Sequence, residues 1–275
     1  MTHSRPLPRE GSTASPEALE LASRQFENGG IQGHCGPYRL LSDVEDPAIL
    51  GACGRIAMDL DAVYEARFAV AATGSPRATI LLFRDRDGYQ AFAAEEGMPS
   101  AGYAGYSMPH RGYMAVWADA SRSSEFAKTL AHELTHLVNR RALGGGLPRW
   151  LSEGLADAIG DTASTEGIQP LIGIAGSEGV AERLRLALEA GNLESVSRLV
   201  ELDDDDFDRA TVSYDYEQSA LLVRYLLTDP ELAPLFRRFL ADIASGAVYS
   251  SDLLQSHLGL EWEELDRRLA VWLAG

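Results

Sequence analysis

The spacing of apolar residues divides the chain into two stretches with different patterns. Between residues 36 and 147, short apolar runs of strand length alternate with segments whose apolar residues recur every three to four positions, as on one helix face. From residue 148 to 275, helical spacing dominates. The pattern predicts an α+β fold, with a mixed sheet and its helices first and a mainly helical subdomain second. Residues 1–35, rich in Pro, Ser, Arg and Glu, are predicted to form a disordered tail.

In the first stretch, the expected elements run strand, helix, strand, helix and hairpin. Strands are expected at 38–42 and 78–83, and helices at 47–68 and 85–96. Two aromatic, alternating segments on either side of a turn with Pro and Gly predict the hairpin, at 101–106 and 113–117. Beyond the middle of the chain, helices are expected at 178–190, 193–202, 231–243, 251–257 and 261–273.

A helix predicted from residue 123 or 124 to residue 143 carries the strongest chemical signal. It contains His132, Glu133 and His136 as an H-E-x-x-H motif, and both histidines lie off its apolar stripe. Residues four apart on a helix are offset by only about 40° and about 6 Å of rise, so both imidazoles can bind one zinc ion at about 2.0–2.1 Å. Glu133 points elsewhere, where it suits a metal-bound water that it could deprotonate. The alternative is a solvated helix face, because this motif also arises by chance.

A second predicted helix, beginning near Pro148, offers a third ligand. A structural zinc normally takes four protein ligands, whereas a catalytic zinc keeps three and leaves a position for water. Glu153 lies 17 residues after His136, and Asp157 lies four residues further on the same helix face. The alternative for Glu153 is an exposed carboxylate near a helix start.

The H-E-x-x-H motif followed by W-L-x-E-G resembles the gluzincin zinc metallopeptidases, the superfamily of thermolysin and the M1-family aminopeptidases. The order of elements is most similar to that of small bacterial peptidase-MA-like proteins. This resemblance implies a gluzincin catalytic unit with one Zn²⁺ per chain, held by His132, His136 and Glu153. It also implies that Glu133 is the general base and that Asp157 orients His132.

The resemblance extends to a tyrosine in the helical stretch. Tyr216-Glu217-x-x-Ala220 is similar to a Y-E-x-x-A segment of M1-like enzymes, whose Tyr donates a hydrogen bond to the oxyanion of the tetrahedral intermediate. This implies the same role for Tyr216, since a phenol is a neutral donor at pH 7. The alternative is a tyrosine at a helix interface, and Tyr214 is a second candidate.

The strand before the zinc helix implies a substrate-binding edge. In gluzincins this strand lies at the edge of the sheet and pairs with extended substrate, which makes Gly112, Tyr113, Met114 and Ala115 candidate substrate-binding residues. The alternative is a buried strand. The stretch lacks the Glu with which aminopeptidases of the superfamily bind the substrate's amine, so aminopeptidase specificity is not implied.

Composition limits the binding partners and the cellular location that we expect for the protein. The formal net charge of −17 argues against nucleic acid and anionic membrane surfaces. No apolar run is long enough to span a membrane or to form a signal peptide, so a cytoplasmic location is expected. Cys35 and Cys53 are too few for a disulfide framework and are expected to be ordinary small side chains. The acidic run 203–206 lacks calcium-loop spacing and is expected to be a solvated loop.

Together these features predict a zinc-dependent metallopeptidase that acts on a peptide or protein substrate. Two alternatives remain: a peptidase-inactive zinc-bearing module that binds peptides or proteins, and a hydrolase of a non-peptide amide. Glu133 disfavours the first alternative, because a pure binding site has no use for a base beside the metal.

Overall fold

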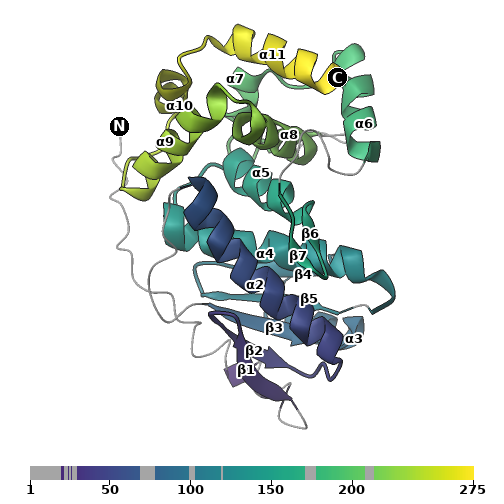
Figure 1. Cartoon of the computed structure of the whole chain (residues 1–275). Helices are drawn as coiled ribbons and strands as arrows, with labels where there is room; N and C mark the ends of the chain where they lie inside the picture. Colours follow the sequence, from purple (N-terminus) through teal and green to yellow (C-terminus); the bar gives the residue numbers. More distant parts are fainter. Residues whose placement is uncertain are drawn as a thin grey trace.

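A computed structural model describes residues 20–21, 24, 26, 30–68, 78–98, 103–118, 120–170, 178–207 and 214–275. In these residues the fold is α+β, as predicted, with a five-stranded mixed sheet. Figure 1 shows the sheet at one end of the molecule, α2 crossing its face, and α8 to α11 gathered at the other end. The helices are α2 (Pro47–Phe68), α3 (Arg86–Glu95), α4 (Ser123–Leu143), α5 (Arg149–Gly160), α6 (Glu178–Glu189), α7 (Val196–Leu199), α8 (Asp215–Thr228), α9 (Leu232–Ala244), α10 (Ser251–Leu258) and α11 (Trp262–Ala274).

The strand order of the main sheet is β1-β2-β3-β5-β4. The pairs β2–β3 and β3–β5 are parallel, whereas the pairs β1–β2 and β5–β4 are antiparallel. The sheet is therefore mixed, with a parallel centre and an antiparallel strand at each edge. The strands are β1 (Ile31–Cys35), β2 (Tyr38–Ser42), β3 (Thr79–Phe83), β4 (Gly105–Met108) and β5 (Tyr113–Trp117); a separate two-stranded sheet joins β6 (Ala163–Ser164) to β7 (Gly167–Ile168).

Successive residues of the central strands pack into two different apolar cores, because strand side chains alternate between the faces of a sheet. Ile80 and Met114 belong to the large core that includes side chains of α2, α4 and α5. Leu81 and Tyr113 belong to the smaller core formed with the aromatic side chains of α3. The zinc helix predicted from the sequence, α4, thus lies on the opposite face of the sheet from α3.

Most predicted elements are confirmed. The helix expected at 193–202 is shorter, because only Val196–Leu199 is helical, and the first hairpin strand lies at Gly105–Met108 instead of 101–106. The predicted tail 1–35 is wrong for residues 31–35, which pair with β2 as strand β1, while residues 1–19 lie outside the described part of the chain. The side chains of β1 are mostly exposed, so the strand has no apolar pattern to reveal it. Gly36, at φ 57°, makes the tight turn that returns the chain to β2.

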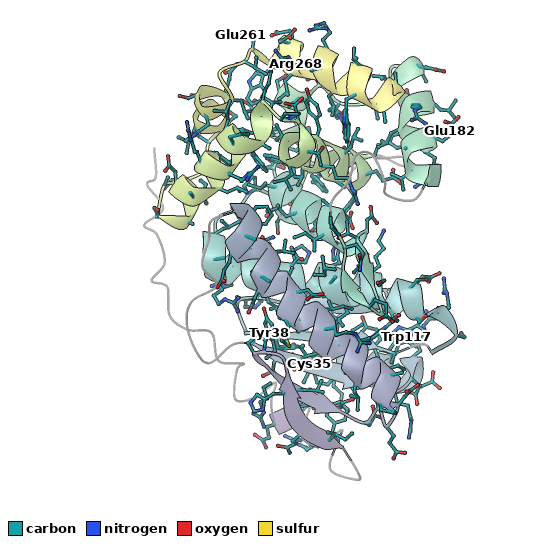
Figure 2. All side chains as sticks on the ribbon, viewed as in Figure 1. Cys35, Tyr38, Trp117, Glu182, Glu261 and Arg268 are labelled. Atoms are coloured by element: carbon teal, nitrogen blue, oxygen red, sulfur yellow. A yellow bond between two sulfur atoms is a disulfide. The ribbon has the colours of Figure 1, made fainter. Side chains whose placement is uncertain are left out.

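The two cysteines are joined, which corrects the expectation that they are independent side chains. Cys35 at the end of β1 forms a disulfide with Cys53 in α2, with a Cα–Cα distance of 6.1 Å (Figure 2). Both residues are buried. Disulfides are rare in the reducing cytosol, so this pairing adds no support to the cytoplasmic location, which stays a prediction. None of the helices in the described ranges has the length and apolar character required to cross a membrane.

Helix α5 packs closely against α8, and Gly154 is the residue that permits the close approach. A Cβ atom at Gly154 would lie 2.7 Å from the backbone oxygen of Ser219 and 2.8 Å from Cγ2 of Val223. Real Cβ atoms do not come this close to other heavy atoms, so any side chain at this position requires the helices to separate. Gly154 follows Glu153 directly on α5, so the close packing on α8 also fixes the position of Glu153.

We expect Gly154→Ala to lower the free energy of unfolding by about 1–3 kcal/mol, the usual cost of overpacking. Gly54→Ala is the matched control: Gly54 also lies inside a helix, α2, but a Cβ atom there meets nothing within 4 Å. The control should be neutral or stabilising by roughly 0.5–1 kcal/mol, because alanine favours the helix. Urea unfolding of both variants tests the difference, and equal effects would contradict the close packing of α5 on α8.

Candidate metal centre

Two helices bring three potential metal ligands together. His132 and His136 project from α4, and Glu153 projects from α5. The two Nε2 atoms are 3.2 Å apart, and each lies 3.5 Å from Oε2 of Glu153. In the described part of the chain, these residues form the one group of His, Cys, Asp or Glu side chains close enough to share a metal ion.

The dimensions of this triangle suit zinc. Ligand atoms about 2.0–2.1 Å from a tetrahedral zinc ion lie about 3.3 Å from one another. The three observed separations of 3.2, 3.5 and 3.5 Å bracket that value. Two imidazoles and one carboxylate also form a donor set of catalytic zinc, which leaves a fourth position open. The three residues therefore fit the zinc ion that the sequence motif implied.

The turn between α4 and α5 explains how Glu153 reaches the histidines. Gly144 ends α4 with φ 90°, a backbone conformation that glycine adopts without strain. Pro148 comes directly before α5 as its N-cap residue, with φ −66°. Its nitrogen carries no hydrogen, so it needs no acceptor there. The short turn folds α5 back against α4, so that one turn into α5 the chain faces the H-E-x-x-H residues.

Each histidine contacts another side chain through Nδ1, the ring nitrogen that does not face the other ligands. Nδ1 of His132 lies 2.9 Å from Oδ1 of Asp157, the contact that the resemblance to gluzincins implied for Asp157. Nδ1 of His136 lies 3.1 Å from Oγ of Ser152. Such partners fix the ring orientation and leave Nε2 for a metal.

Ser152 and its neighbours are site residues that the sequence did not reveal. Asn139 donates through Nδ2 to the backbone oxygen of Ser152 at 3.4 Å, and its Oδ1 accepts a hydrogen bond from the hydroxyl of Tyr64 at 2.5 Å. The chain of contacts therefore runs from α2 through Asn139 and Ser152 to His136. The sequence held one signal for Ser152, its position directly before Glu153 on α5. A residue next to the third ligand also lies close to α4, where it can contact a histidine.

The electrostatics of the cluster favour positive charge between the three ligands. Burial alone would lower the pKa of His132, but hydrogen bonds to Asp157 and Glu153 outweigh it and raise that pKa to about 10. Burial would raise the pKa of Glu153, but hydrogen bonds from His132 and His136 hold that pKa well below its usual range. A site with this preference is suited to a cation.

Glu133 lies beside the edge of the sheet. A Cβ atom at Gly105 in β4 would lie 3.3 Å from Cγ of Glu133 and 2.9 Å from Cγ2 of Thr129. Strand β4 therefore passes directly beneath α4 at the position of the predicted base. A glycine at residue 105 is what allows the backbone to come so near.

The predicted substrate-binding strand is wrong in its position. Gly112, Tyr113, Met114 and Ala115 were expected at the edge, but β5 lies inside the sheet between β3 and β4. All four residues are buried, and the backbone oxygen of Gly112 accepts a hydrogen bond from Thr79 at 2.9 Å. The cause is the hairpin itself: β4 folds back antiparallel onto β5 and occupies its outer side, so the edge strand next to α4 is β4.

Tyr216 lies in the first turn of α8, and its hydroxyl accepts a hydrogen bond from Nη2 of Arg149 at 2.6 Å. The guanidinium of Arg149 also lies over the rings of Phe207 and Tyr216, at 5.1 and 5.6 Å from their centroids. Arg149 is one helical turn before Glu153 on α5. Tyr216 is thus linked to the helix that carries the third ligand, and its role in catalysis stays a prediction. Tyr214 lies just before α8, as its N-cap residue.

No protein-family model matches this chain, and no curated protein matches it. The site's own geometry is therefore the basis for a functional assignment.

Proposed function

We propose that the protein is a zinc-dependent metallopeptidase of the gluzincin type. The observation that carries the proposal is the triangle of His132, His136 and Glu153, with zinc-like spacing and a partner behind each imidazole. A carboxylate adjoins this triangle, since Glu133 follows His132 directly on α4. The combination of a three-ligand site and an adjacent base is that of hydrolytic zinc enzymes.

The protein's own residues would divide the work of hydrolysis as follows. His132, His136 and Glu153 would hold the zinc ion, which when bound polarises a carbonyl oxygen and acidifies water. The Glu133 side chain projects about 100° away from that of His132, so it can face the attacking water. Its carboxylate would accept the water's proton and later pass it to the leaving amine.

A free strand edge beside Glu133 supports a peptide as the substrate. The backbone nitrogen of Trp117 donates a hydrogen bond to the backbone oxygen of Ala104. Because hydrogen-bonded positions alternate along an antiparallel ladder, the backbone N–H and C=O groups of Gly105 and Ser107 point away from β5. Among the described strands, β4 has a neighbour on one side only. An extended peptide could add to this edge through backbone hydrogen bonds, with its chain held next to Glu133.

The proposal is tested by cleavage of a diverse peptide library with the zinc-loaded protein, read by mass spectrometry. We expect new peptide termini that disappear on chelation and return with added zinc. A protein that holds zinc and binds peptides without cleaving any would support the inactive binding module instead. Cleavage of small amides but of no peptide would support the non-peptide amide hydrolase.

Tyr216→Phe tests the proposed oxyanion donor. Removing the hydroxyl of Tyr216 should lower kcat by about 10²–10³-fold, the usual loss for one oxyanion donor. KM should change little, because the bond forms mainly in the transition state. Steady-state kinetics on a cleaved peptide, with Tyr214→Phe as the control, checks the expectation; full activity in Tyr216→Phe would transfer the role to Tyr214.

A further inference from the structure

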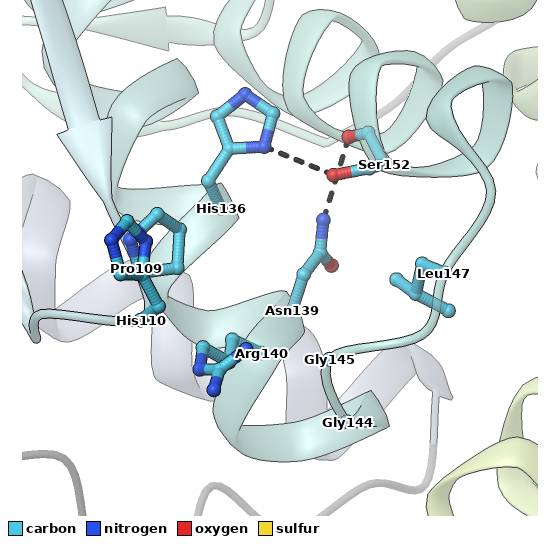
Figure 3. A pocket seen from close by; sticks show the side chains of 9 residues that line it. All are labelled: Pro109, His110, His136, Asn139, Arg140, Gly144, Gly145, Leu147 and Ser152. Carbon is cyan, nitrogen blue, oxygen red and sulfur yellow. Dashed lines mark hydrogen bonds between the residues drawn. The ribbon is translucent and has the colours of Figure 1, made fainter. Parts of the chain in front are cut away.

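A pocket of about 210 Å³ adjoins the candidate metal centre (Figure 3). Its walls come from the β4–β5 turn with His110, from the C-terminal half of α4 with His136 and Arg140, and from the start of α5 with Ser152. At about 30 Å³ for a water molecule, the volume has room for several waters or one amino acid side chain. The pocket therefore has the size of a subsite rather than of a packing defect.

The pocket and the metal centre lie on two sides of one imidazole ring. Nε2 of His136 faces His132 and Glu153, whereas Nδ1 faces Ser152, which lines the pocket. A substrate with its reacting bond at the metal centre could therefore extend into the pocket along His136. This contiguity links whatever the pocket binds to the choice of substrate.

The charge of the pocket is opposite to that of the chain. The chain has 41 Asp and Glu residues against 24 Lys and Arg, yet no described carboxylate lines the pocket. Arg140 has no hydrogen-bond or ion-pair partner among the described residues. The adjacent Arg141, in contrast, pairs with Asp61 at 2.8 Å. In so acidic a protein, a half-buried arginine without a carboxylate marks a place where an anion would be stabilised.

The turn after α4 holds the guanidinium against the pocket wall. A Cβ atom at Gly145 would lie 2.5 Å from Nη1 of Arg140, so a side chain there would push the guanidinium aside. The absence of a side chain at residue 145 thus lets Arg140 lie along the turn. His110, from the β4–β5 turn, also lines the pocket and has a ring N–H that can donate to a ligand there.

We propose that this pocket binds a carboxylate of the substrate, so that the enzyme prefers peptides with an acidic group near the cleaved bond. The inference rests on the proposed peptidase function. Arg140 would contact the carboxylate with two parallel N–H donors, the geometry that guanidinium offers and lysine does not. The carboxylate belongs either to an Asp or Glu side chain or to the C-terminus of the substrate.

The test measures binding separately from cleavage. Zinc-loaded Glu133→Gln protein is titrated with fluorescein-labelled, Ala-rich octapeptides that carry one Glu or one Gln at each position in turn. Each peptide has either a free or an amidated C-terminus. We expect the acidic member of one pair to bind roughly 10- to 100-fold more tightly, the usual range for a hydrogen bond to a charged group. A preference at an internal position identifies a side chain, and a preference for the free terminus identifies the C-terminal carboxylate.

Variants of Arg140 assign the preference to this pocket. Adding Arg140→Gln should reduce the acid-to-neutral affinity ratio to near one, and Arg140→Lys should restore it only in part. Arg86→Gln on α3 is the control, because it removes the same charge from an exposed residue on the opposite side of the sheet. Gly145→Ala, which displaces the guanidinium without removing charge, should also lower the ratio and replaces Arg140→Gln if that variant does not fold.

The outcomes separate the two proposals. An acid-to-neutral ratio near one in the parent for every peptide pair overturns the carboxylate pocket, whether or not the enzyme cleaves the library. A ratio that survives both Arg140→Gln and Gly145→Ala overturns it as well. A ratio that depends on Arg140 in a protein that cleaves no peptide supports the pocket and refutes only the peptidase proposal.

Discussion

Zinc should be lost from the protein when His132 or His136 is replaced by alanine. Each imidazole supplies one of three ligand atoms, so either change leaves two protein ligands, too few for a stable site. Glu153→Ala should lose the metal nearly as completely, because its Oε2 lies equally far from both Nε2 atoms. Elemental analysis after metal-free purification and zinc re-addition should give about one Zn²⁺ per wild-type chain, as one three-ligand site requires.

His257→Ala is the control for this experiment. His257 contacts Asp242 at 3.1 Å in the helical half of the molecule, away from the three ligands. The His257→Ala protein should therefore keep its zinc. A wild-type protein without zinc after re-addition would remove the basis of the site, and unchanged affinity in Glu153→Ala would show that another residue is the third ligand.

Glu133→Gln should abolish cleavage while the protein retains zinc. The amide has nearly the shape of the carboxylate but cannot accept the water's proton, so we expect activity to fall by at least about 10²–10⁴-fold, the usual contribution of a general base. Glu133 is not one of the three ligands, which is why the metal should remain. Initial rates on a library-derived peptide, with zinc content measured on the same samples, check both expectations.

Glu125→Gln is the matched control, because it makes the same chemical change on the same helix. Glu125 is in the exposed first turn of α4, where it pairs with Arg122. It should leave the rate unchanged. Substantial activity in Glu133→Gln would mean that another group takes the proton, and loss of zinc in that variant would mean that Glu133 holds the metal centre together.

The parts of the site that depend on one helix could be predicted from the sequence. The i, i+4 spacing of His132 and His136 determines their separation wherever the helix lies, and the Gly and Pro after it mark its end. The contact between Asp157 and His132 was accessible only through resemblance to known enzymes, because it joins two helices. Its role and that of Glu153 remain predictions until metal binding is measured.

The features that the sequence did not reveal all join distant segments. The strand β1 pairs with β2 although its own side chains are mostly exposed, and Cys35 meets Cys53 across the space between β1 and α2. The order of the strands also depends on distant contacts. Periodicity predicted the strand β5, but only the packing of the hairpin determines that β4 is the edge strand. Periodicity reports the faces of an element and not its neighbours.

The division of the ligands between two helices has a thermodynamic consequence. Two ligands belong to α4 and one to α5, and α5 in turn packs against α8 through Gly154. A metal ion that binds this arrangement and not the unfolded chain stabilises the fold by mass action, by about 2.7 kcal/mol at one hundred times its dissociation constant. Zinc bound there would act as a removable cross-link between the sheet-bearing half and the helical half. The folded population would then depend on the free zinc concentration of the surroundings, and scarcity of the ion would loosen the junction on which the site itself is built.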